Sequence, residues 1–135
     1  MTASTSKTFF SAFFKTLGLL WGFILTGLFL DSNLMQQWIA KPQWIANSVM
    51  LIGFFLCFKN VTPRIKEQMI TAVIIAVIGE YLFSIVLGMY TYRLENVPHY
   101  VPPGHALVYV GVLYFTKTAF TKLHRRLLEK IFTII

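Results

Sequence analysis

MITAVIIAVIGEYLFSIVLGMYTY, residues 69–92, is the stretch of sequence that decides the fold. It contains one acidic residue, Glu80, and no basic residue. An α-helix of about 20 apolar residues crosses the hydrocarbon core of a bilayer, which is about 30 Å thick. The stretch therefore predicts a transmembrane helix over residues 69–92.

Three further apolar blocks have the length of membrane spans, at about 9–30, 40–58 and 103–120. The last begins at Pro102-Pro103-Gly104, and proline is tolerated at a helix start because its missing N–H would lack a partner there. The chain is 56% hydrophobic and 13% charged, whereas soluble domains carry about 25% charged residues. We expect an all-α integral membrane protein in which residues 1–135 form a single domain of four transmembrane helices.

The Lys and Arg residues predict the orientation. The N-terminal segment carries two (Lys7 and Lys15), the three loops carry one, three and one, and the tail from Lys117 onwards carries five. By the positive-inside rule, both termini and the second loop lie in the cytoplasm, and we expect a bacterial inner membrane. An aromatic belt then falls at the outer boundary, formed by Trp38, Trp44, Tyr90, Tyr92 and Tyr100.

Residues 121–135 form a basic amphipathic tail, with apolar residues at helical spacing on one side and basic residues on the other. This pattern predicts a helix on the inner leaflet, where anionic lipid attracts each basic group by about 1 kcal/mol. An alternative is that the apolar residues 131–135 begin a fifth span.

Several function classes are excluded. The formal charge of +7 is spread between the apolar blocks instead of forming one patch, so nucleic acid is not expected as a partner. The single cysteine, Cys57, excludes an internal disulfide and a cysteine-based zinc motif. Phosphate-binding glycine loops and nucleophile motifs are absent from the sequence, and no cofactor is expected.

Small residues at i, i+4 spacing predict where helices touch, because helices in lipid associate through close backbone approach. The first span carries Gly18, Gly22 and Thr26, and the third carries Ala72, Ala76, Glu80, Ser84 and Gly88. We expect either a close crossing of these two spans or self-association through one of the rows. A partner membrane subunit could use the same surface.

Glu80 is the leading candidate for a functional residue. It lies about 12 residues from either end of the predicted third span, near the bilayer midplane. A charge there costs at least about 2.5 kcal/mol, so intramembrane acids are functional candidates. The structural alternative is a carboxyl group hydrogen-bonded to a hydroxyl of a neighbouring helix, such as Thr26, Ser48 or Tyr114.

The predicted outer loop, residues 90–105, contains a second set of candidates, namely Tyr92, Arg93, His99 and His105. His105 lies in the first turn of the fourth predicted helix, where free N–H groups favour an anion. These residues predict a site for a phosphate or carboxylate headgroup. Alternatively, Arg93 pairs with Glu95 or with lipid phosphate, and both histidines lie in water.

Glu80, His99 and His105 are together a familiar zinc ligand set. At 1.5 Å per helical residue, however, Glu80 is predicted to lie roughly 15 Å below Tyr90, while His105 lies at the mouth of the bundle. Only a loop that folds back into the bundle could join them. A metal site is therefore not expected.

In size and span count the chain resembles the small multidrug-resistance transporters and the small flippase-like proteins associated with polyprenyl-linked sugars. The essential glutamate of those multidrug transporters lies in the first span, whereas Glu80 lies in the third, so its role is not carried over. We expect a binding or transport component with Glu80 as its polar core group. The alternatives are an enzyme acting on a lipid-like substrate at the outer leaflet through His99 or His105, and a structural subunit.

Overall fold

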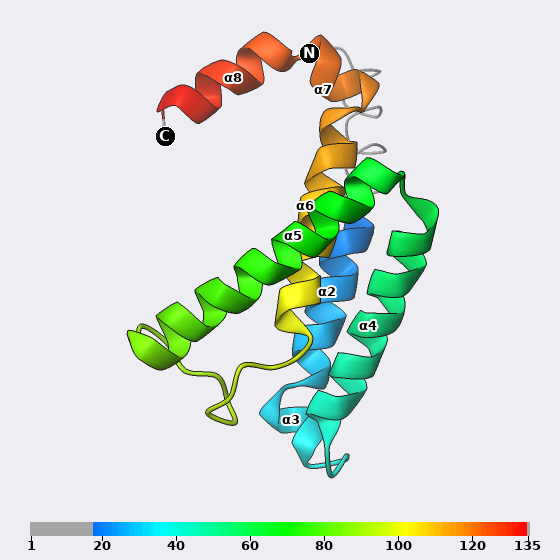
Figure 1. Ribbon diagram of the computed structural model, residues 1–135. Coiled ribbons are helices and arrows are strands. Elements are labelled where there is room, and N and C mark those ends of the chain that lie inside the picture. The colour runs from blue at the N-terminus through cyan, green and yellow to red at the C-terminus, as the bar shows by residue number, and fades with distance from the viewer. Residues whose placement is uncertain (1–17, 135) are drawn as a thin grey trace.

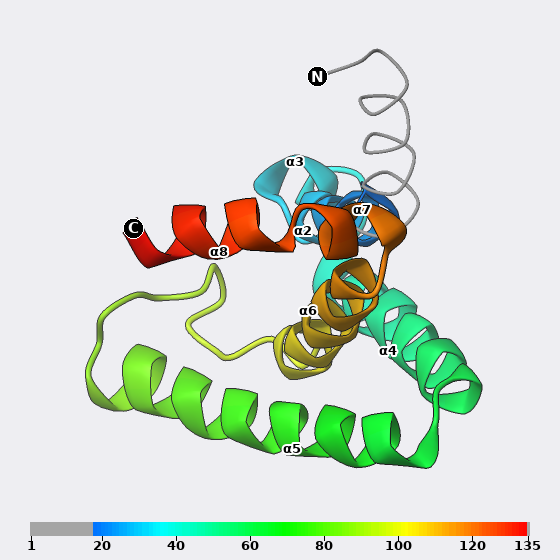
Figure 2. The same ribbon diagram turned by 90° about the horizontal axis from the view of Figure 1, so that it is seen from above.

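The computed structural model describes residues 18–134, and all regular structure in that range is helical. Three helices lie side by side, α2 (Leu19–Leu30), α4 (Pro42–Asn60) and α6 (Val101–Thr116) (Figure 1). A fourth, α5 (Pro63–Glu80), packs along α6 and runs obliquely, so that its far end lies away from the other three (Figures 1 and 2). The predicted all-helical fold class is confirmed for the described residues.

The connections alternate between the two ends of the molecule. The α4–α5 turn and the segment after α6 lie at one end, and the short helix α3 (Asn33–Gln36) and the α5–α6 loop lie at the other (Figure 1). Most of the basic residues outside the helix interiors belong to the first end, and the predicted aromatic belt belongs to the second. The orientation of the two ends relative to a membrane stays a prediction.

Proline marks the beginning of the long helices α4, α5 and α6, where it lies in the first turn. The observed bounds of α4 and α6 overlap the predicted spans 40–58 and 103–120 closely. The predicted span 69–92 is shifted, because the helix begins earlier, at Pro63, and ends earlier, at Val86. Residues 9–17 of the predicted span 9–30 lie outside the described residues.

The end of α5 is irregular. It continues into a π-helical segment, Tyr81–Val86, and Gly88 then takes a left-handed conformation with φ of 58°. Glycine adopts that conformation at little cost, which is why it commonly ends helices. Gly88 therefore turns the chain back; the sequence pattern had assigned it to helix packing.

One helix in the described range, Pro63–Val86, is long and apolar enough to cross a membrane by length and composition. The helix over Leu20–Leu30 is apolar but shorter. Polar side chains such as Gln43 and Asn47 interrupt α4, and α6 has 16 residues. The prediction of four spans stays a prediction.

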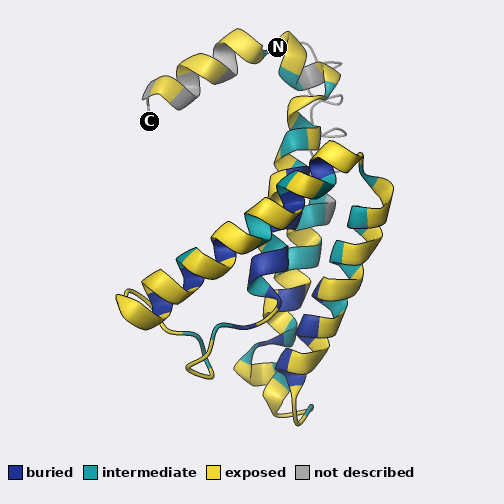
Figure 3. Cartoon of the chain, in the orientation of Figure 1, coloured by how far each residue is buried: buried dark blue, intermediate teal, exposed yellow. Residues whose placement is uncertain are grey.

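The core lies where α4, α5 and α6 meet, around Met50, Met69, Ala106, Leu107 and Val110. Buried residues line this shared axis, and the outer faces are exposed in the isolated chain (Figure 3). The outer faces carry large apolar side chains on three helices, among them Trp21, Leu25, Phe29, Phe55, Leu56, Ile74, Ile75 and Ile78. An apolar exterior of this extent suits contact with lipid or with other helices.

The predicted close crossing of the first and third spans is not the packing observed. α5 packs on α6, while α2 packs on α4 and α6. Among the described residues, no atom outside the backbone of its own helix and its two chain neighbours lies within 4 Å of where a Cβ on Gly22 would be. A Cβ on Gly53, in contrast, would meet the Phe23 ring at 2.6 Å, and one on Gly111 would overlap Leu20. Close approach occurs at Gly53 and Gly111. Self-association through the predicted rows stays a prediction.

The tail is helical, as predicted, with a break at His124 between α7 (Ala119–Leu123) and α8 (Arg125–Ile134). In Figure 1, α8 runs at a steep angle to α6 and away from the four long helices. Arg125 donates to Glu129 at 2.6 Å, an i, i+4 ion pair on the exposed side. Because of the break at His124, α8 points away from the bundle and does not extend α6.

Candidate functional site

Glu80 is buried at the last residue of α5, where the regular helix passes into the π-helical segment. Its Oε2 atom accepts hydrogen bonds from the hydroxyls of Tyr90 at 2.5 Å and Tyr92 at 2.7 Å. Gly88 reverses the chain and brings both tyrosines back onto the helix that they follow. One carboxylate oxygen is thus held by two hydroxyl donors from the same loop.

The expected hydroxyl partners of Glu80 are engaged elsewhere. Thr26 and Ser48 donate to backbone carbonyls within their own helices, those of Gly22 and Trp44. Tyr114 lies beneath the ammonium group of Lys117. Glu80 is thus hydrogen-bonded to hydroxyls, as the structural alternative holds, but the returning loop supplies them and Thr26, Ser48 and Tyr114 do not.

His105 lies opposite the other carboxylate oxygen. Its Nε2 atom is 3.7 Å from Glu80 Oε1, and its Nδ1 atom is 3.0 Å from the carbonyl oxygen of Val101. The first turn of α6 fixes the imidazole, since Val101 and His105 are one helical turn apart. The structure joins Glu80 and His105, which the depth argument from the sequence had kept apart.

The depth argument failed for two reasons. The helix ends at Val86, so Glu80 lies six residues, about 9 Å along the axis, from its end and not in its middle. The loop then folds back instead of continuing outwards, which the hydrogen bonds of Tyr90 and Tyr92 demonstrate. Glu80 is therefore reached by groups from the predicted mouth of the bundle.

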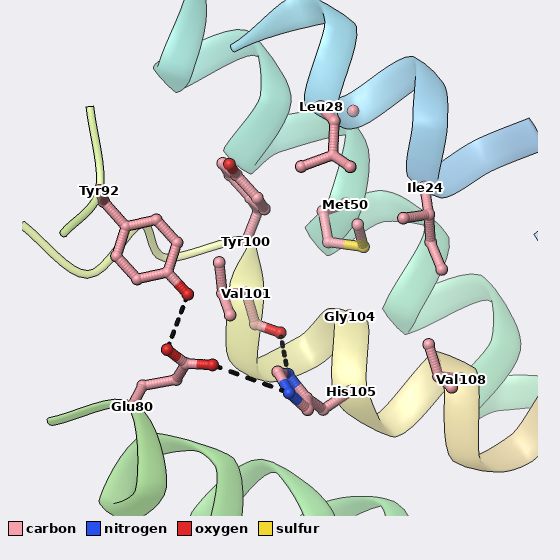
Figure 4. A pocket seen from close by; sticks show the side chains of 11 residues that line it. Ile24, Leu28, Met50, Glu80, Tyr92, Tyr100, Val101, Gly104, His105 and Val108 are labelled. Carbon is pink, nitrogen blue, oxygen red and sulfur yellow. Dashed lines mark hydrogen bonds and ion pairs between the residues drawn. The ribbon is translucent and has the colours of Figure 1, made fainter. Parts of the chain in front are cut away.

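A cavity of about 390 Å³ adjoins the pair. Four polar residues lie at one end, Glu80, Tyr92, Tyr100 and His105, and the remaining wall is apolar (Figure 4). α2, α4 and α6 supply that wall, which consists of Ile24, Gly27, Leu28, Met50, Val101, Gly104 and Val108. Pockets for small ligands have volumes of about 300–1,000 Å³ and few, converging polar groups, so the cavity has the form of a ligand site.

The site holds its tyrosines in the neutral form. Burial raises the pKa of Tyr92, and its hydrogen bond to Glu80 raises it further. The hydrogen bond to Glu80 also raises the pKa of Tyr90. A phenol that donates to a carboxylate would lose that bond and face a second negative charge on ionising. Both hydroxyls therefore act as hydrogen-bond donors.

Arg93 fastens the same loop to the end of α2. Its guanidinium donates to the Asp31 carboxylate at 2.6 Å, to the Asp31 carbonyl at 2.8 Å and to Gln36 at 2.6 Å. The second Asp31 carboxylate oxygen accepts from Tyr100 at 3.0 Å, and burial together with this bond raises the pKa of Tyr100. The ion pair between Arg93 and Asp31 therefore holds the α5–α6 loop against the end of α2.

The three basic candidates make contacts with different residues. Arg93 pairs with Asp31 and not with Glu95, and His99 stacks on Trp44 with ring centroids 6.3 Å apart, while His105 faces Glu80. Within the described residues, no group of three metal-ligating side chains comes together. The geometry therefore favours neither an anion site built from Arg93, His99 and His105 nor a metal site built from Glu80, His99 and His105.

Sequence reasoning found Glu80, Tyr92 and His105 but missed Tyr90 and Asp31. A signal for Tyr90 exists, since residues two apart in an extended segment point to the same side, and Tyr90 and Tyr92 follow shortly after Gly88.

Comparison of the chain with protein-family models, with curated proteins and with solved structures finds no match.

Proposed function

We propose that this chain is a multi-pass membrane component that binds a small amphipathic ligand in the cavity beside Glu80 and carries it in a transport process. The observation that carries the proposal is a buried carboxylate at the polar end of an otherwise apolar cavity of about 390 Å³. An apolar ligand body gains free energy by leaving water, about 25 cal/mol per Å², and the polar group sets its orientation.

The membrane setting is part of the same proposal. The large apolar side chains exposed on α2, α4 and α5 face lipid, the basic end lies in the cytoplasm, and the α5–α6 loop lies on the outer side. The amphipathic helix α8 rests on the inner leaflet, with its basic groups near anionic lipid. In this placement the Glu80 cavity lies towards the outer side.

Equilibrium dialysis against the purified protein in detergent tests the proposal. The probes are radiolabelled octylamine, octanol and octanoate, with empty micelles subtracted. We expect saturable binding of at least one probe at one site per chain. The substitution Val108→Phe, which fills the cavity wall, should weaken that binding about tenfold or more.

Val112→Phe is the matched control, because Val112 is exposed one turn further along α6 and does not line the cavity. It should bind the probe as the wild type does. The proposal fails if no probe binds saturably, or if Val108→Phe and Val112→Phe bind the probe equally well.

A second function, an enzyme acting on a lipid-like substrate, is favoured by the contact of 3.7 Å between Glu80 and His105. Acid–base pairs are often loose without substrate and tighten when it binds. Such an enzyme would change its ligand, whereas a carrier returns it unaltered. Mass spectrometry distinguishes the enzyme from the carrier. The protein is incubated in lipid vesicles in ²H₂O, the masses of the lipids are compared before and after, and His105→Gln serves as the blank. A structural subunit would neither bind nor change a ligand.

A further inference from the structure

We infer that the ligand of the Glu80 cavity is an alkylammonium ion with at least two N–H donors, which binds in exchange for a proton held between Glu80 and His105. The inference rests on the proposed binding function and specifies its ligand. It follows from the directions in which the lone pairs of two side chains point.

The backbone fixes the tautomer of His105. A carbonyl oxygen only accepts hydrogen bonds, so the contact of 3.0 Å between His105 Nδ1 and the Val101 oxygen places the hydrogen on Nδ1. In the neutral imidazole, Nε2 then carries a lone pair. That lone pair is directed at Glu80 (Figure 4).

Glu80 Oε1 is likewise an acceptor. The neighbouring oxygen, Oε2, takes both tyrosine hydroxyls, which leaves Oε1 facing Nε2 at 3.7 Å. Two acceptors that face each other repel unless a proton or a hydrogen-bond donor lies between them. In the empty cavity a proton on the pair meets this requirement, giving one net proton shared by Glu80 and His105.

A ligand nitrogen can replace that proton. N–H···O and N–H···N bonds are about 2.9 Å long, so one nitrogen reaches both Oε1 and Nε2, whose separation is less than twice that length. A primary ammonium has donors for both acceptors and a positive charge for the carboxylate. A quaternary ammonium lacks the donors, an alcohol lacks the charge, and a carboxylate is repelled.

Among the described residues, 18–134, no competing cation faces the pair. The ionisable groups that face Glu80 are Tyr90 and Tyr92 from the loop and His105 from α6. α2 and α4 contribute only apolar residues to the cavity, such as Leu28 and Met50. Arg93, the nearby basic side chain of the loop, is held by Asp31. The polar end thus carries one net negative charge once the proton leaves, and the rest suits an alkyl chain.

The exchange is balanced in charge and in protons. The incoming ammonium keeps its own protons, the pair releases one proton to water, and Glu80 stays a carboxylate beside a neutral His105. The His105 side chain is 54% exposed, which gives the proton a path out.

Binding of octylamine by the full-length wild type in detergent, with proton release recorded by a pH indicator in weak buffer, tests the inference. We expect one proton released per amine bound, and a Kd at least about tenfold lower than those of octanol and octyltrimethylammonium. Glu80→Gln should lose this preference, while Glu67→Gln, an exposed position of the same helix, should retain it.

Octanol or octyltrimethylammonium binding as tightly as octylamine would overturn the inference while leaving the binding function intact. Octylamine binding without proton release would also overturn it. Saturable binding of none of the probes would instead remove the binding function itself. Should Glu80→Gln fail to fold, Tyr92→Phe and His105→Gln provide the comparison, since each alters one side of the pair and His105→Gln abolishes the proton release.

Discussion

Tyr92, a loop residue, contributes both to the stability of the fold and to the candidate site. Its hydroxyl donates to buried Glu80 at 2.7 Å, and burial raises its pKa. Replacing it with phenylalanine should lower the free energy of unfolding near pH 8 by about 1.5–3 kcal/mol, the usual contribution of a hydrogen bond to a charged group.

The pH dependence of that loss has a definite sign. Because the pKa of Tyr92 is raised by folding, the stabilisation is complete below about pH 10, the ordinary pKa of tyrosine. It declines as the pH rises through the folded value, since the unfolded phenol ionises first. Melting curves between pH 8 and 11 should show wild type and Tyr92→Phe converging. A gap of constant size, or the same loss in Tyr81→Phe, contradicts the prediction.

Arg93 has a structural task that its sequence position did not reveal. The Arg93 and Asp31 side chains are 18% and 8% exposed, and their contact joins the loop to the end of α2. Removing one partner of a buried ion pair strands the other charge, so Arg93→Met should cost about 3 kcal/mol or more. Thermal denaturation in detergent measures the loss.

The double variant Asp31→Asn with Arg93→Met provides the control for that prediction. It leaves no uncompensated charge, and it should recover part of the stability that Arg93→Met loses. Equal melting of Arg93→Met and wild type would show that the pair contributes nothing to folding.

Among the elements, the packing glycines provide the sharpest comparison. A side chain on Gly53 would push into the Phe23 ring of α2, whereas one on Gly22 would enter open space. Gly53→Leu should destabilise the α2–α4 contact by about 1–3 kcal/mol, the usual cost of overpacking. Gly22→Leu should melt as the wild type does.

Size-exclusion chromatography with light scattering completes that comparison. If Gly22→Leu alters the oligomer and not the melting temperature, the small-residue row of α2 mediates self-association. A melting temperature that falls more for Gly22→Leu than for Gly53→Leu contradicts the packing described.

The elements also show which features the sequence could predict. Apolar block length located α4 and α6 closely, and Pro102 and Pro103 marked the beginning of α6, because both signals follow from local chemistry. The π-helical end of α5 and the reversal at Gly88 were not predicted, since no periodic pattern marks them. Glu80 could be identified from the sequence, because a charged residue within an apolar stretch costs free energy. Its partners could not, because they reach Glu80 only through the chain reversal at Gly88.

For the whole molecule, the alternating ends make a topology prediction. Thr62 lies in the α4–α5 turn and Thr91 in the α5–α6 loop, and both are exposed. In a Cys57→Ser background, a membrane-impermeant maleimide applied to intact cells should label Thr91→Cys, whereas it should label Thr62→Cys only after lysis. Labelling of both, or of Thr62→Cys alone, would contradict the proposed orientation.

The cavity beside Glu80 can be examined directly by diffraction from crystals grown in a lipid phase with 8-bromooctylamine. The anomalous signal of bromine should lie among Ile24, Met50 and Val108, with the amine nitrogen between Glu80 and His105. Bromine found only on the outer faces of α2, α4 and α5, with the cavity empty at saturating ligand, would contradict a binding role for the Glu80 cavity.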